Sequence, residues 1–156
     1  MSIRNSEYRF SPFVIGLHWL TVLLIIAVYA SMELRGLAPK GSSLRDAMKS
    51  SHYLLGLGVL AVVVIRIWVR IQAGAKPAIR PPMPRWQATL ADAMHYALYI
   101  FILAMPLLGW LTLSAAGKPI ILFGLPIPSL IDANVALSRQ LKDVHEALAT
   151  LGYVLI

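Results

Sequence analysis

Long apolar runs alternate with short polar and basic segments along this chain. Three of these runs span about residues 12–32, 50–71 and 88–114. A helix rises about 1.5 Å per residue, so about 20 residues cross the hydrocarbon core of a membrane. The segments between the runs are rich in glycine, proline and basic residues, which favour loops. The pattern therefore predicts three membrane-spanning helices, the first starting at the Ser11-Pro12 pair.

A fourth helix is predicted for residues 135–156, with a different pattern. Its first twelve residues include Arg139, Lys142, Asp143 and Glu146, and only about ten apolar residues follow Glu146. A complete span needs about 20, so we expect the native protein to continue beyond Ile156. The predicted fold is an all-α membrane protein in which residues 1–156 form a single domain, a bundle of four transmembrane helices.

Composition supports a membrane bundle and excludes several chemistries. Of the 156 residues, 58% are hydrophobic and 13% are charged, and the mean hydropathy is +0.71, which is too apolar for an ordinary soluble domain. The chain has no cysteine, which excludes disulfides, a thiolate nucleophile, iron–sulfur ligation and covalent c-type haem attachment. The net charge of +7 fits basic loops at a lipid surface better than nucleic-acid binding.

Each of the four histidines lies near the start of a predicted span. Because successive spans alternate in direction, His18 and His95 lie on the side of the N-terminus, and His52 and His145 lie on the other side. Neutral imidazole is a usual axial ligand of b-type haem, and two facing helices can hold one iron between two imidazoles. Two levels of histidine therefore suggest two haems stacked across the membrane. The alternative for each histidine is a hydrogen-bonded structural role.

Polar and small residues on the same helix faces fit this interpretation. Arg66 follows His52 by fourteen residues, which places both within about 40° on one helix face and about 21 Å apart along the axis. Arg66 either pairs with a haem propionate or extends its guanidinium to the lipid headgroups. Gly56 and Gly109 lie on the faces of His52 and His95, where they either leave room for a porphyrin or permit close helix packing.

Short sequence markers occur in the spans and directly after the first of them. The first span contains His18-Trp19, the sequence MELRG follows it, and the last helix contains KDVHEALATLGY. With these markers the chain resembles the bacterial cytochrome b561 family over almost its whole length. The resemblance implies a four-helix core with two b haems, similar to the haem-bearing membrane subunits of formate dehydrogenases and nickel–iron hydrogenases.

The resemblance also implies haem ligands at matching positions. His52 and His145 would ligate the haem on the side away from the N-terminus, and His18 would ligate the other haem. In the family, the partner of His18 is a second histidine fourteen residues after the one that matches His145, a position beyond Ile156. Either the sequence is part of a longer protein or His95 takes this place. The short fourth span favours the first option, and His95 is then expected beside that haem or beside a bound quinone.

The function implied is oxidoreductase chemistry in the bacterial inner membrane. Characterised family members include a superoxide oxidase, so we expect electrons to pass from superoxide, or from a redox partner protein on the periplasmic side, to ubiquinone or another quinone. Basic residues divide evenly between the two sides, and the basic connector after the second span, together with the resemblance, places the N-terminus in the cytoplasm.

Two other functions remain open. The first is a haem-bearing anchor subunit that passes electrons for a partner dehydrogenase or hydrogenase. The second is a haem-free protein that uses its histidines for free metal ions. Basic residues near His52 and His145 would attract superoxide or simply contact lipid headgroups; they are Arg45, Lys49, Arg139 and Lys142.

Overall fold

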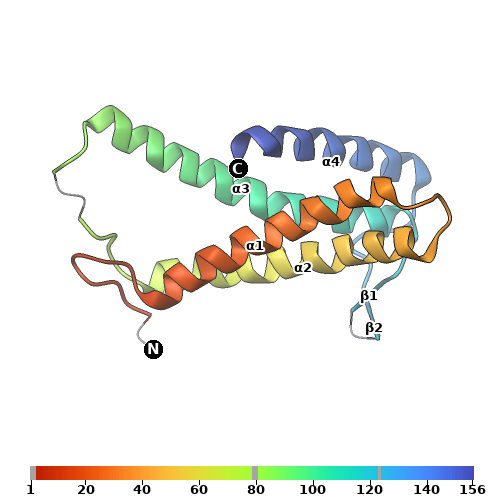
Figure 1. Cartoon of the computed structure of the whole chain (residues 1–156), viewed down its shortest axis with the longest axis horizontal. Coiled ribbons are helices and arrows are strands. Elements are labelled where there is room, and N and C mark those ends of the chain that lie inside the picture. Colours follow the sequence, from red (N-terminus) through yellow and green to blue (C-terminus); the bar gives the residue numbers. More distant parts are fainter. Residues whose placement is uncertain (1–2, 79–80, 123) are drawn as a thin grey trace.

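Helices dominate the computed structural model, which describes residues 3–78, 81–122 and 124–156. Within these ranges lie the helices α1 (Pro12–Leu34), α2 (Ser43–Gln72), α3 (Arg85–Ala115) and α4 (Val135–Leu155). A short 3₁₀ helix, η1 (Arg35–Leu37), follows α1, and an antiparallel hairpin of β1 (Ile120–Leu122) and β2 (Leu125–Ile127) precedes α4. Figure 1 shows the long helices running roughly along one axis, with the hairpin projecting from one end.

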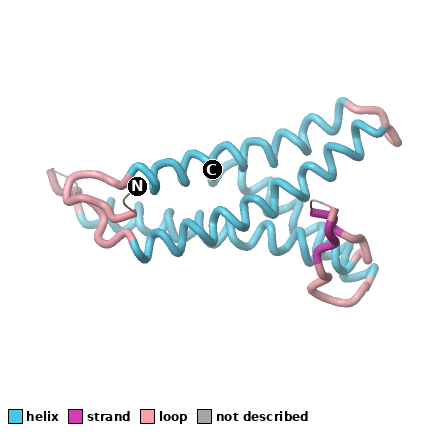
Figure 2. The backbone as a smooth tube through the Cα atoms, turned by 90° about the horizontal axis from the view of Figure 1, so that it is seen from below, coloured by secondary structure: helices cyan, strands magenta, loops and turns pink. Residues whose placement is uncertain are grey.

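The helices form an up-and-down bundle. Helix α1 packs on α2, α2 packs on α3, and α3 packs on α4. The hydroxyl of Tyr29 in α1 closes the ring by donating to the carbonyl of Ala149 in α4 at 2.9 Å. We call the end where α1 and α3 begin the N-terminal end, and the end that carries the hairpin the far end; both are visible in the view of Figure 2.

Three of the helices begin at polar caps. A side-chain oxygen of Ser11, Ser42 or Asn134 accepts from the backbone N–H three residues later, at 3.2, 3.3 and 3.0 Å. Such caps satisfy backbone donors that a helix leaves unpaired at its start. The start predicted for the first helix at Ser11-Pro12 is confirmed.

Helix α2 begins at Ser43, earlier than the span predicted from residue 50. The charged residues before that point were expected in a loop or a short surface helix, because they do not belong in hydrocarbon. They instead form the first turns of the helix, capped by Ser42, with Asp46 in a favourable position near the positive end of the helix dipole. The apolar run predicted from residue 50 indicated only the part of the helix that is suited to lipid. The Ser42 cap determines where the helix itself starts.

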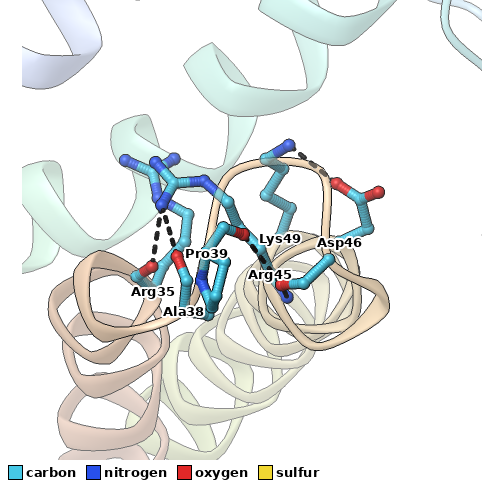
Figure 3. A network of polar contacts seen from close by, with 7 residues as sticks. Arg35, Ala38, Pro39, Arg45, Asp46 and Lys49 are labelled. Atoms are coloured by element: carbon cyan, nitrogen blue, oxygen red, sulfur yellow. Dashed lines mark hydrogen bonds and ion pairs between the residues drawn. The ribbon is translucent and has the colours of Figure 1, made fainter.

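The turn between α1 and α2 is fixed by Arg45. Its Nη1 atom donates to the carbonyls of Arg35 and Ala38, both at 3.0 Å (Figure 3). Beside it, Lys49 pairs with Asp46 at 2.8 Å. The sequence left open whether Arg45 attracts an anion or contacts lipid headgroups. In the structure its guanidinium holds this turn in place through backbone carbonyls.

Three helical segments in the described part of the chain are long and apolar enough to cross a membrane: Pro12–Leu37, Ser43–Gln72 and Arg85–Ala115. Helix α4 is not among them, and its first twelve residues include four charged ones. Large apolar side chains face outward, including Leu23, Ile26 and Ile100 with exposed fractions of 62%, 59% and 68%. An apolar exterior with its backbone groups paired inside helices suits a lipid environment.

Candidate cofactor site

A cavity of about 570 Å³ lies between the helices in the far half of the bundle, with residues from all four helices in its wall. This volume falls within the range of about 300–1,000 Å³ that is typical of ligand and cofactor sites. Most lining residues are apolar, such as Ile25, Leu57 and Met105, and the polar ones include His52 and His145. The cavity can therefore hold a large, mainly apolar molecule.

The two histidines face each other across the bundle. Their ring centroids are 6.2 Å apart and their planes meet at 82°. Both side chains are half-buried, His52 on α2 and His145 on α4. Two metal–nitrogen bonds of about 2.0 Å, plus about 1.1 Å from each nitrogen to its ring centroid, add to a separation of about 6 Å. The pair is spaced to bind one metal ion from opposite sides.

Hydrogen bonding prepares His52 to act as a ligand. Its Nδ1 atom lies 3.3 Å from the carbonyl oxygen of Val28 and 3.4 Å from the hydroxyl of Ser31. Because a carbonyl only accepts, we assign the proton to Nδ1, which leaves the lone pair of Nε2 free for a metal. An outer partner of this kind fixes the orientation of ligating histidines.

His145 has a different environment. Its Nδ1 atom is buried, and no hydrogen-bond partner for it exists among the residues that the structure describes. A buried polar atom without a partner is unfavourable by about 1–3 kcal/mol. Since Nδ1 is enclosed on the side of Gly109, the other ring nitrogen, Nε2, is the one that can bind a group in the cavity.

Gly109 of α3 provides the space for the His145 ring. A Cβ atom at this position would lie 3.3 Å from Cε1 and 3.8 Å from Nδ1 of His145. The sequence left open whether this glycine makes room for a porphyrin or for helix packing. Its nearest neighbour in the structure is the imidazole itself, so the glycine determines where that ring sits.

We therefore expect Gly109→Ala to displace the His145 ring by a few tenths of an ångström and, if this ring ligates a haem iron as the sequence predicts, to weaken that bond. The measurement is the reduced-minus-oxidised visible spectrum and the electron paramagnetic resonance of the ferric form, in which the signal of this site should shift or partly convert to high spin. Gly16→Ala is the matched control, because no other described residue comes within 4 Å of a Cβ atom there. An unchanged ferric signal in Gly109→Ala would contradict this role.

The donor set distinguishes between a free metal ion and a metal held in a porphyrin. Within the described residues there is no group of three or more His, Cys, Asp or Glu side chains that could hold a metal ion. Free transition-metal ions generally take four or more ligands in proteins. Two imidazoles beside a large apolar cavity instead fit an iron porphyrin, whose ring supplies the other four nitrogens.

The N-terminal end brings three other predicted residues near one another. Arg66 of α2 contacts Nδ1 of His18 through its Nη2 atom at 3.5 Å, and His95 is close enough to His18 for an electrostatic interaction. A guanidinium has no acceptor, so Nδ1 of His18 accepts here and a neutral ring carries its proton on Nε2. Ligation through Nε2 therefore requires Arg66 to release this ring.

His95 shows the opposite arrangement. Its Nδ1 atom lies 2.6 Å from the carbonyl of Ala91, one turn earlier in α3, so its Nε2 atom keeps a free lone pair. The guanidiniums of Arg66 and Arg70 both lie over the ring of Tyr99, with Cζ 5.5 and 5.7 Å from its centroid. Such cation–π contacts link α2 to α3 at this end.

Three residues important for the cavity were not identified from sequence. Tyr153 of α4 donates to Glu33 of α1 at 2.5 Å, and both residues line the cavity. Gly152 lies where α4 meets Tyr29 and the ring of Phe101. All three residues belong to the sequence markers quoted above, which was the available signal. The markers alone do not show which helices these residues join.

The comparisons with known proteins agree on one family. A family model described as prokaryotic cytochrome b561 matches residues 9–156. The chain is 39% identical over 148 residues to "Cytochrome b561 homolog 1" of Escherichia coli K12, covering 95% of this chain and 84% of that protein. It is 34% identical over 148 residues to "Probable superoxide oxidase CybB" of Yersinia pestis, covering 95% and 82%. A second Escherichia coli protein, "Cytochrome b561 homolog 2", is 28% identical over 128 residues, covering 80% and 65%.

Proposed function

Because the chain belongs to the prokaryotic cytochrome b561 family, which implies b-type haem, we propose that it transfers electrons across the bacterial inner membrane through two b haems. The bundle then has four membrane-spanning helices in a single domain. The observation that carries the proposal is the pair His52 and His145, 6.2 Å apart across a cavity that all four helices line. Bound haem supplies reversible one-electron chemistry.

The protein's own contribution at this site is ligation and exclusion of water. His52 offers Nε2, since Val28 and Ser31 hold its Nδ1 atom. His145 supplies the opposing nitrogen from α4, in the space left by Gly109. The largely apolar wall keeps the local dielectric low, which strengthens every electrostatic effect on the iron.

His18 is the proposed ligand for the second haem, at the N-terminal end. Arg66 releases the His18 ring in this proposal and pairs with a propionate, which its planar guanidinium suits. His95 is its polar neighbour and lines either this haem or a quinone bound there. The support is the contact of Arg66 with His18 and the electrostatic proximity of His95.

Superoxide is the proposed donor, and it reaches the far end. Of the described charged residues that line the cavity, four are cationic and two are acidic, namely Arg35, Lys49, Lys118 and Lys142 against Glu33 and Glu146. An excess of positive charge raises the local concentration of a small anion. The far end is then periplasmic and the N-terminus cytoplasmic, and two superoxide anions reduce one ubiquinone with two protons to ubiquinol and two molecules of oxygen. One of the relatives is named a probable superoxide oxidase, which is consistent with this reaction.

The test is superoxide-driven reduction of a soluble ubiquinone analogue by the purified protein, without any partner subunit. We expect reduction that superoxide dismutase abolishes and that slows as salt screens the attraction. Lys118→Gln should lower the rate at low salt about two- to fivefold, because this lysine lies at the far-end opening of the cavity. Arg85→Gln, at the N-terminal end, is the matched control and should leave the rate unchanged.

Each other outcome identifies a different function. A protein that holds haem but reduces quinone only with a partner dehydrogenase or hydrogenase is an anchor subunit. A folded preparation without haem would overturn the cytochrome proposal itself and favour free metal ions as the ligand.

A further inference from the structure

Two buried polar side-chain atoms lack a hydrogen-bond partner among the residues that the structure describes: Nδ1 of His145 and Nε of Arg35. Both residues line the same cavity. An imidazole binds a metal through the ring nitrogen that it keeps free, and a guanidinium suits a carboxylate or phosphate. Because both residues line one cavity, a single bound molecule that carries a metal and an anionic group would contact both of them.

The backbone of Arg35 is held in a defined position. Arg35 is the first residue of η1, directly after α1, and its carbonyl accepts from Nη1 of Arg45 at 3.0 Å (Figure 3). The residue is half-buried at the far end of the bundle, close enough to His52 for an electrostatic interaction. Arg35 therefore reaches the cavity that contains the imidazole pair from a fixed turn.

The nearby acids already have partners. Glu33 accepts from Tyr153 at 2.5 Å, Asp46 pairs with Lys49 at 2.8 Å, and Glu146 pairs with Lys142 at 2.9 Å. A half-buried guanidinium with an unpaired nitrogen is unfavourable unless an anion approaches it. Since these acids are engaged elsewhere, the anion that completes the Arg35 site comes from outside the chain.

We propose that Arg35 binds a propionate of the haem held by His52 and His145. This inference rests on the proposed function, and it assigns to the far end a carboxylate site separate from Arg66. A planar, permanently charged fork matches a carboxylate in a way that a lysine ammonium does not.

The test compares haem retention in the intact haem-loaded protein and in Arg35→Met, which keeps the length of the side chain and removes its charge. Transfer of haem to excess apomyoglobin is followed through the spectral component that His145→Ala lacks. We expect this transfer to be about ten- to a hundredfold faster in Arg35→Met, since hydrogen bonds to charged groups are the strong ones. Arg35→Lys should recover part of the difference.

Resonance Raman spectroscopy provides a reading that a purely structural role would not change. The propionate bending mode should shift in Arg35→Met and stay unchanged in Arg139→Met, where the arginine is exposed and does not line the cavity. If Arg35→Met loses haem at the wild-type rate and keeps the wild-type propionate mode, the inference is overturned and the proposed function remains intact. Wild-type protein without haem would instead overturn the proposed function.

Discussion

Replacement of His145 by alanine is expected to remove all of the low-spin haem signal that arises from the far-end cavity. The imidazoles of His145 and His52 are 6.2 Å apart, a separation that suits one metal between them. A single remaining imidazole cannot provide both axial bonds, and the two ligands come from different helices, so neither can substitute for the other. The measurement is the haem-to-protein ratio together with the reduced-minus-oxidised spectrum of the purified variant.

Two further variants make this result specific. His52→Ala should give the same loss, because it removes the other half of the same pair. His95→Ala should keep the far-end signal, since this residue lies at the N-terminal end and its Nδ1 atom contacts the carbonyl of Ala91. Added imidazole should restore part of the signal in His145→Ala by entering the space that the side chain leaves. Full haem content with an unchanged spectrum in His145→Ala would show that the cavity does not hold the haem.

The sequence predicted the membrane helices because each depends on residues close together in the chain. Apolar runs of sufficient length and the Ser11-Pro12 start signal are local, and in the structure Ser11 caps α1. The predicted start of the second span was too late, since the charged residues before it, among them Arg45 and Asp46, were expected in a loop or a short surface helix and instead form the first turns of the capped helix α2. Hydropathy shows which residues avoid lipid, and it does not show whether they are helical.

The pairing of His52 with His145 was within reach of sequence because both lie near the starts of the second and fourth spans, which run in the same direction and so place the two residues at the same predicted depth. The resemblance to the cytochrome b561 family named the same two residues. Sequence could not supply the separation of the rings, the orphaned nitrogen of His145 or the hydrogen bond of His52 to Val28. These features depend on the axial position and rotation of each helix relative to its neighbours. The sequence pattern of one helix does not determine either of them.

Contacts between α1 and α4 were the least predictable part of the site. The pairs Tyr29–Ala149 and Glu33–Tyr153 join residues about 120 positions apart. The rings of Tyr29 and Tyr153 also pack edge to face with centroids 4.7 Å apart. We call these contacts between α1 and α4 the α1–α4 seam. The seam closes the ring of helices and thereby positions α4, which carries His145. The stability of the seam should therefore control haem binding.

Gly152→Ala tests this dependence and should destabilise the protein by about 2 kcal/mol. A Cβ atom at Gly152 would collide with the Tyr29 hydroxyl and lie 2.7 Å from Cζ of Phe101. If the Tyr29 ring moves away, its hydroxyl loses the hydrogen bond to the Ala149 carbonyl. If the Phe101 ring moves instead, it enters the cavity that it lines. The gain of about 1 kcal/mol in helix propensity from alanine is too small to offset this. Thermal unfolding of the haem-loaded protein in detergent should show a Tm lower by about 5 °C, with faster haem loss.

Two comparisons separate the collision from a general effect of alanine in a membrane helix. Gly16→Ala should leave Tm unchanged or slightly higher, since within the described structure nothing lies within 4 Å of its Cβ position, and the residue is about 200° around α1 from His18. Adding Tyr29→Phe to Gly152→Ala removes the hydroxyl that the new methyl group meets. The double variant should therefore be more stable than the sum of the two single effects, by about 1 kcal/mol. Additive effects would show that the methyl group is accommodated elsewhere and that α4 does not depend on this seam.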